Sequence, residues 1–234
     1  MAACRASIRL DDLVARPGPL VLGEMHGTVE IPALVRSLVD RAVATGRRVR
    51  VGLELPPSAL EPASTGWWRT ARDGRGSRAM ADLVRHVGQL STAHDVACVP
   101  LDTEFTVLSA ALTRDEEMAA ALVATARRSP DAFVVALVGN VHSRVDDIDC
   151  PLDGPPMAMV ATAELPGLRS LLVVPDGGFG WGITDPERPG GPYPVRPGDA
   201  GHRLGVHWWP APVEHHEGHW CIGPVTPSPP AADA

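Results

Sequence analysis

Two short apolar runs, each ending in a turn that carries glycine and histidine, constrain this chain more than any other feature. Residues 20–22 are Leu-Val-Leu, and Gly23-Glu24-Met25-His26-Gly27 follow them. Residues 134–138 are Val-Val-Ala-Leu-Val, and Gly139-Asn140-Val141-His142 follow them. Each run is typical of a buried strand. The shared G-x-x-H spacing predicts two histidines at one edge of a parallel sheet, the edge where open α/β sheets bind ligands.

Strand and helix patterns alternate along the first two thirds of the chain, which predicts an α/β fold with a mostly parallel sheet covered by helices. The second apolar run is expected to form a strand over residues 133–138, and further strands are expected at residues 49–53, 96–101, 157–162 and 171–174. Helical spacing is expected after Thr28, over residues 80–90 and after Thr113, where Thr113-Arg114-Asp115-Glu116 has the form of a capping box.

The composition changes after Pro175. Residues 1–175 are expected to form the α/β domain, with the candidate site at the C-terminal ends of its strands. Residues 176–234 are rich in Pro, Gly, His and Trp and show no clear periodicity. This extension is expected to be irregular, to pack on the same domain and to be partly disordered from Val225 onward.

Charge and hydropathy exclude several classes of protein. The net charge of −7 offers no basic field for a nucleic-acid backbone. No run approaches the ~20 apolar residues of a membrane span, and the first residues lack the apolar core of a signal peptide. The four cysteines are scattered, without a C-x-x-C pair. We therefore expect a cytoplasmic protein with reduced thiols, acting on a small-molecule or peptide substrate.

Acidic residues follow the other predicted strands of the sheet. Glu54 ends the second strand, and Asp102 and Glu104 follow the third. With Glu24, His26 and His142 they suit two chemistries: acid/base hydrolysis with a histidine-activated water, or a divalent metal site. His26, His142, Glu24 and Glu54 are the metal-ligand candidates, for Zn, Mn, Co or Fe. Taken alone, Glu104 is better explained as a capping or solvated residue.

The helix start at Thr113 supplies two further candidates. Asp115 gains from the helix dipole in the first turn, whereas Arg114 is disfavoured there. We therefore expect Arg114 to have a partner, which is Glu24, Glu54, or a carboxylate or carbonyl of the substrate.

The chain has no G-x-S-x-G turn, and Ser143 follows His142 without one. Attack by water is therefore preferred to an acyl-enzyme. The C-terminal cluster of His215, His216 and His219 is interpreted as a solvated loop with incidental metal affinity. Trp208 and Trp209 are expected to cover the rim and shape an apolar pocket. The candidate substrate contacts are Asp102, Asp115, Asn140, Trp208 and Trp209.

Four of these segments resemble, in order, the erythromycin esterase/ChaN/Tiki (TraB-like) superfamily. They are Gly23-Glu24-Met25-His26, the strand ending in Glu54, Arg114-Asp115-Glu116-Glu117-Met118-Ala119 and Val138-Gly139-Asn140-Val141-His142. The resemblance covers roughly residues 19–145 and is closest to the ChaN-like haem-uptake branch. It implies that Glu24 and His26 act as orienter and water-activating base, with Glu54, Arg114 and His142 as further catalytic residues.

The resemblance leaves three functions open. The leading one is an ester or amide hydrolase, or a related acyl-transfer enzyme, metal-free or metal-assisted. The first alternative is a haem- or metal-binding protein that uses the same histidines as ligands. It is weakened by the absence of a lipoprotein signal, and Tyr193 is the single tyrosine able to ligate haem. The second alternative is a peptide-modifying enzyme of a biosynthetic cluster.

Overall fold

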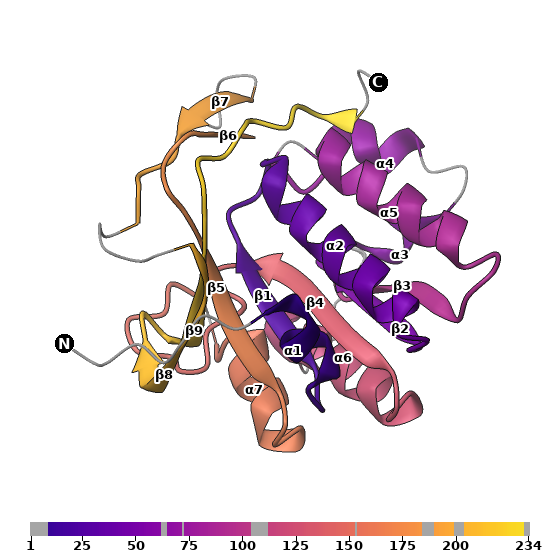
Figure 1. The fold of residues 1–234 in the computed structure, drawn as a ribbon. Helices are drawn as coiled ribbons and strands as arrows, with labels where there is room; N and C mark the ends of the chain where they lie inside the picture. Colours follow the sequence, from indigo (N-terminus) through magenta and orange to yellow (C-terminus); the bar gives the residue numbers. More distant parts are fainter. Residues whose placement is uncertain are drawn as a thin grey trace.

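A computed structural model describes residues 9–61, 65–71, 73–103, 112–152, 154–183, 190–198 and 204–231. The fold is α/β: a seven-stranded sheet in the order β3-β2-β4-β1-β5-β9-β8, flanked by helices (Figure 1). Its strands are β1 (Leu20–Glu24), β2 (Val49–Leu53), β3 (Val96–Pro100), β4 (Phe133–Gly139), β5 (Arg169–Pro175), β8 (Gly205–Val213) and β9 (His216–Ile222). All neighbours pair in parallel except β8, which runs antiparallel to β9 at one edge.

Each face of the sheet is covered by helices because the central strands are apolar on both sides. One layer holds α1 (Leu10–Ala15), α2 (Glu30–Ala44), α3 (Pro57–Leu60), α4 (Thr65–Thr70) and α5 (Arg78–Leu90). The opposite layer holds α6 (Arg114–Arg128) and α7 (Met157–Glu164). Along β4, Val135 and Leu137 face the first layer, whereas Val134, Ala136 and Val138 face the second. None of the helices in the described ranges is long and apolar enough to cross a membrane.

The start of α6 follows the predicted capping box. The Thr113 hydroxyl accepts a hydrogen bond from the Glu116 N–H (3.2 Å), and the Glu116 carboxylate accepts one from the Thr113 N–H (2.7 Å). This reciprocal pair fixes where the helix begins. It thereby fixes Arg114 and Asp115 in the first turn, facing the end of the sheet.

The prediction of a strand over residues 157–162 is wrong, because this segment belongs to helix α7. A short apolar run without periodicity fits a buried helix as well as a buried strand. Contacts from distant residues decide the outcome here. The Met157 N–H donates to Asp115 Oδ1 (2.8 Å) and the Ala158 N–H donates to the His142 carbonyl (3.0 Å), so the first turn of the helix is satisfied by the site itself.

Much of the C-terminal segment is regular, against the expectation of irregular structure. Strands β8 and β9 extend the main sheet, and β6 (Phe179–Gly182) pairs with β7 (Gly191–Pro194) in a separate hairpin. Residues 225–231, for which disorder was expected, run back across the molecule: Pro227 pairs with Thr28, and Pro230 pairs with Ser77. In Figure 1 the hairpin lies above the C-terminal end of β1.

Candidate active site

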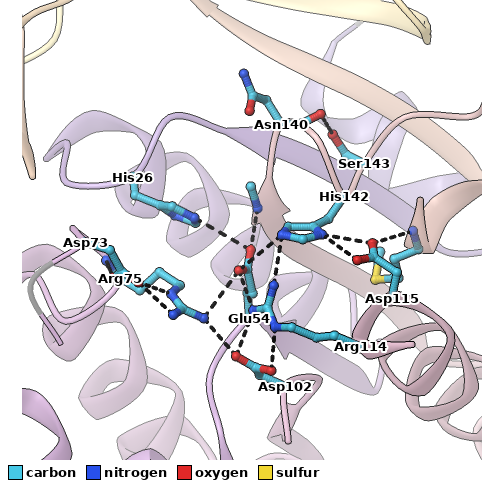
Figure 2. Close-up of polar contacts among 12 residues, drawn as sticks. His26, Glu54, Asp73, Arg75, Asp102, Arg114, Asp115, Asn140, His142 and Ser143 are labelled. Atoms are coloured by element: carbon cyan, nitrogen blue, oxygen red, sulfur yellow. Dashed lines mark hydrogen bonds and ion pairs between the residues drawn. The ribbon is translucent and has the colours of Figure 1, made fainter. Parts of the chain in front are cut away.

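The Glu54 carboxylate lies at the centre of the site (Figure 2). It follows β2, next to β4, and it is buried. Its Oε2 accepts a hydrogen bond from the Gly139 N–H (2.6 Å), and its Oε1 accepts one from Arg114 Nη2 (2.7 Å). Burial opposes the charge, but the cationic groups around it, His26 first among them, lower the pKa of Glu54 to about 2. Glu54 is therefore an anion at neutral pH.

Two histidines flank this carboxylate from opposite sides. His26 Nε2 lies 3.6 Å from Glu54 Oε2, and His142 Nε2 lies 3.6 Å from Glu54 Oε1. Gly139 separates the rings: a Cβ placed there would be 3.1 Å from His26 Nε2 and 3.4 Å from His142 Cδ2. The two G-x-x-H turns therefore bring their histidines together, and the glycine of the second turn leaves room for both.

His26 is held as a cation. Its Nδ1 lies 2.8 Å from Glu24 Oε1, and its Nε2 faces Glu54. Burial favours the neutral ring, but the two carboxylates outweigh it and raise the pKa of His26 to about 9. At neutral pH the ring carries two N–H groups, one of them directed at the carboxylate between the histidines.

The hydrogen bonds of His142 fix the orientation of its ring and its tautomer. Its Nδ1 lies 2.8 Å from Asp115 Oδ1, and its Nε2 lies 2.9 Å from Arg114 Nη1. Arginine has no acceptor, so Nε2 must accept this bond with its lone pair and Nδ1 must carry the proton. Asp115 is itself fixed by the Met157 N–H at the start of α7. A buried carboxylate thus sets both the orientation and the tautomer of His142.

Two arginines neutralise the carboxylates beneath the histidines. Arg114 donates to both Asp102 oxygens through Nε (2.9 Å) and Nη2 (2.7 Å), and Arg75 Nη1 donates to Asp102 Oδ2 (2.8 Å). Burial opposes the charge of Arg114, but Asp102 and Glu54 raise its pKa. The predicted partner of Arg114 is therefore Glu54, together with Asp102. The planar guanidinium suits this role because it bonds two carboxylates at once.

A pocket of about 470 Å³ opens above these groups. Glu24, His26, Gly139, Asn140 and His142 line it on the side of the sheet. Its other lining residues are Met25, Asp73, Val141, Gly182, Ile183 and Tyr193. The pocket is large enough for a small organic molecule or one end of a larger one.

Other candidates lie away from the pocket lining. Asp102 and Asp115 hold Arg114 and His142 from below, with neither carboxylate lining the pocket. Trp208 packs against the core, with the Arg16 guanidinium 5.4 Å from its ring centre. Trp209 contacts the His219 ring edge-to-face on the outer strands. The tryptophans thus do not form the rim, and Glu104 lies outside the described residues.

Two residues of this site, Asp73 and Arg75, were not predicted from the sequence, and Tyr193 was considered only as a haem ligand. Asp73 and Arg75 lie in a polar, glycine-containing segment. Gly74, with φ of +91°, packs against the backbone of His26 and Trp181, and this packing places Arg75 beneath the histidines. Tyr193 comes from β7, and its hydroxyl donates to the His26 carbonyl (2.9 Å). No local motif marks any of the three.

The C-terminal histidines are more ordered than expected, because His216 and His219 are buried in β9. His216 Nε2 lies 2.8 Å from the Ser143 hydroxyl, which ties the turn after His142 to β9. Burial lowers the pKa of His216 to about 4, so it is neutral. In the described part of the chain, no group of three or more His, Cys, Asp or Glu side chains is arranged to hold a metal ion.

No protein-family model matches this chain. No curated protein matches it significantly by sequence. Solved structures do resemble it. A succinoglycan biosynthesis protein has a TM-score of 0.58 at 9% identity, covering 94% of this chain and 91% of that one. A Bacillus cereus protein has a TM-score of 0.56 at 12% identity, covering 95% and 93%.

The type III effector HopBA1 also resembles the chain, with a TM-score of 0.50 at 13% identity, covering 96% of this chain and 97% of that one. All three likenesses extend over nearly the whole length of both chains. At these identities they establish a shared fold and nothing about shared chemistry. The function must therefore be argued from the site.

Proposed function

We propose that this protein is a hydrolase that splits an ester or amide, including a peptide bond, by attack of water. One observation carries the proposal: two histidines with opposite hydrogen-bonding roles face one pocket. His142 is oriented by Asp115 and presents an acceptor at Nε2, whereas His26 is cationic between Glu24 and Glu54. Groups whose surroundings give them opposite roles are the usual basis of an acid/base pair.

His142 is the better candidate for the general base. Its Nε2 carries the lone pair that can take a proton, and the imidazolium formed by proton uptake would be stabilised by Asp115 at Nδ1. In the free protein Arg114 Nη1 donates to this lone pair. A water molecule must displace that donor, after which the guanidinium keeps its bonds to Glu54 and Asp102.

His26 is the better candidate for the acid. The cationic ring lies at the pocket wall and can donate from Nε2 to an oxygen that gains negative charge, or to the leaving group. This assignment departs from what the family resemblance implies, which makes His26 the water-activating base.

A metal-assisted version fits the donor set poorly. Glu54 accepts hydrogen bonds at both oxygens, and His142 Nε2 accepts one from Arg114. A metal ion would have to displace the proton of His26 before this ring could serve as a ligand. We therefore propose that the guanidinium of Arg114 occupies the position that a cation would take in a metal hydrolase.

Hydrolysis of chromogenic substrates tests this proposal. We expect the purified, tag-free protein to release p-nitrophenol or p-nitroaniline from part of a panel of neutral esters and amides. The rate is expected to stay unchanged after dialysis against EDTA, because the charge at the site comes from arginine. Loss of activity on chelation, restored by Zn, Mn, Co or Fe, would show that the metal-free mechanism is wrong.

The haem-binding alternative is checked with the same preparation. A Soret band on adding haemin, lost in a His26→Ala or Tyr193→Phe variant, together with no turnover across the panel, would support a binding protein instead. Tyr193 lines the pocket, where it is in position to ligate haem. Both the haem absorption and the hydrolysis of the panel must therefore be measured.

The pH dependence of turnover gives a second, sharper prediction. If protonated His26 is the acid, kcat/KM should fall as pH rises through about 9, where His26 loses its proton. Glu24→Gln removes one of the charges that hold the proton, so the fall should move to lower pH. Asp131→Asn, a surface change far from the pocket on an 86% exposed side chain, is the control. An unchanged profile in Glu24→Gln would contradict the assignment of His26.

A further inference from the structure

The β6–β7 hairpin forms a fixed wall of the pocket. The Trp181 N–H of β6 donates to the Gly27 carbonyl (2.8 Å), and a Cβ at Gly27 would overlap the Trp181 carbonyl. Gly27 has φ of +76°, a conformation that favours glycine. The hairpin therefore packs closely on the turn that carries His26, a contact that this glycine makes possible.

Tyr193 completes this wall. A Cβ at Gly180 would lie 2.6 Å from the Tyr193 hydroxyl oxygen, and one at Gly182 would lie 3.2 Å from its ring, so both glycines make room for the ring to cross β6. The hydroxyl donates to the His26 carbonyl (2.9 Å). The Tyr193 ring and Ile183 therefore line the pocket from the hairpin, which packs on the turn that carries His26.

The lining has two chemically different parts. Met25, Val141, Ile183 and Tyr193 give an apolar side, and 40% of Ile183 is left exposed. Among the described residues, the charged side chains that line the pocket are Glu24, Asp73 and His26. Asp73 is paired with Arg75 (2.6 Å). The whole cluster nevertheless holds more carboxylates than cations: Glu24, Glu54, Asp73, Asp102 and Asp115 against His26, Arg75 and Arg114. This excess disfavours a further anion, while an apolar group gains by covering the exposed side chains.

We infer that the hairpin selects substrates whose group next to the scissile bond is apolar and uncharged, and that it disfavours anionic ones. This inference rests on the proposed hydrolase function for its kinetic test. Because the inference concerns the charge and lining of the pocket, ligand binding tests it even where no substrate is hydrolysed.

A matched pair of ligands tests the binding preference separately from hydrolysis. Butyranilide and succinanilic acid have acyl groups of the same length, but the second ends in a carboxylate. We expect calorimetry to show that butyranilide binds at least about tenfold more tightly than succinanilic acid. The carboxylate of succinanilic acid would meet the negative charge of the pocket. With p-nitrophenyl butyrate and mono-p-nitrophenyl succinate, which share a leaving group, kcat/KM should show the same preference.

Two variants on one hairpin give the control. Ile183→Arg puts a cation at the pocket wall. The ratio of the two dissociation constants, which measures the preference for butyranilide, should therefore shrink at least about fivefold. Phe179→Arg adds the same charge at a more exposed site of the hairpin that does not line the pocket, and should leave the preference unchanged. Equal binding of the two anilides, or equal shifts in both variants, would overturn the inference. A binding preference without any ester turnover would instead support the inference and contradict the hydrolase.

Discussion

His142→Gln is expected to lower kcat by about 10²- to 10⁴-fold, the contribution typical of a positioned general base. Glutamine fills a similar space and can still accept from Arg114, but it cannot take a proton from water. The fold should be preserved, because the ring contributes little to the apolar core and the carbonyl that caps α7 belongs to the backbone. Steady-state kinetics, with circular dichroism as a check on the fold, measure the effect.

A second histidine–aspartate pair provides a matched control. His86 of α5 pairs with Asp40 of α2 on the surface, away from the pocket. His86→Gln removes the same chemical group and should leave kcat within about twofold of the wild type. A His142→Gln variant that also remains within twofold would rule out His142 as the base.

Asp115→Asn tests how the base is held. The amide oxygen can still accept from the Met157 N–H and from His142 Nδ1, so the tautomer can persist. The negative charge that stabilises the imidazolium is lost, however. We expect kcat to fall, but by less than in His142→Gln. A loss equal to that of His142→Gln, with α7 intact, would show that the charge is as necessary as the base itself.

The sequence indicated which strand ends meet, and it did so through short-range signals. Buried apolar runs that end in a polar residue or in a glycine-containing turn placed Glu24, His26, Glu54 and His142 at one edge of the sheet. The structure brings these residues together because parallel strands share the edge at which they end. Arg114 was also found, since a cation in the first turn of a helix needs a partner.

The pairings within the site could not be predicted in the same way. Asp115 was expected to contact substrate, yet it bonds His142 and caps α7, 42 positions away along the chain. Tyr193 and Arg75 reach the site from a hairpin and a loop whose positions depend on close packing at Gly27 and Gly74. Such contacts arise from the packing of distant segments, which local propensity and periodicity do not describe.

Arg114→Met is expected to destabilise the protein by about 3 kcal/mol, the cost typical of removing one partner from a buried ion pair. Asp102 and Glu54 are both buried, and each loses a charged donor in this variant. Arg75 still contacts both carboxylates, but only at 3.4 Å for Glu54, so it compensates in part. Equilibrium unfolding in urea measures the difference.

Arg127→Met is the control, because it removes an arginine from the same helix. Arg127 pairs with Glu164 at the surface, where the two side chains are 60% and 49% exposed. Exposed pairs contribute little, so this change should cost less than about 1 kcal/mol. Similar losses in the two variants would show that the network around Glu54 is no more stabilising than a surface ion pair.

A double-mutant cycle with Asp102→Leu then measures the interaction between Arg114 and Asp102 separately from their other contacts. Asp102→Leu removes the carboxylate that Arg114 and Arg75 share, and Arg114 keeps Glu54 as a partner. Because Arg114→Met leaves Asp102 buried without its main donor, the double variant should be more stable than the sum of the single losses predicts. Strict additivity would mean that the two side chains do not interact, and that Arg114 acts on stability through Glu54 alone.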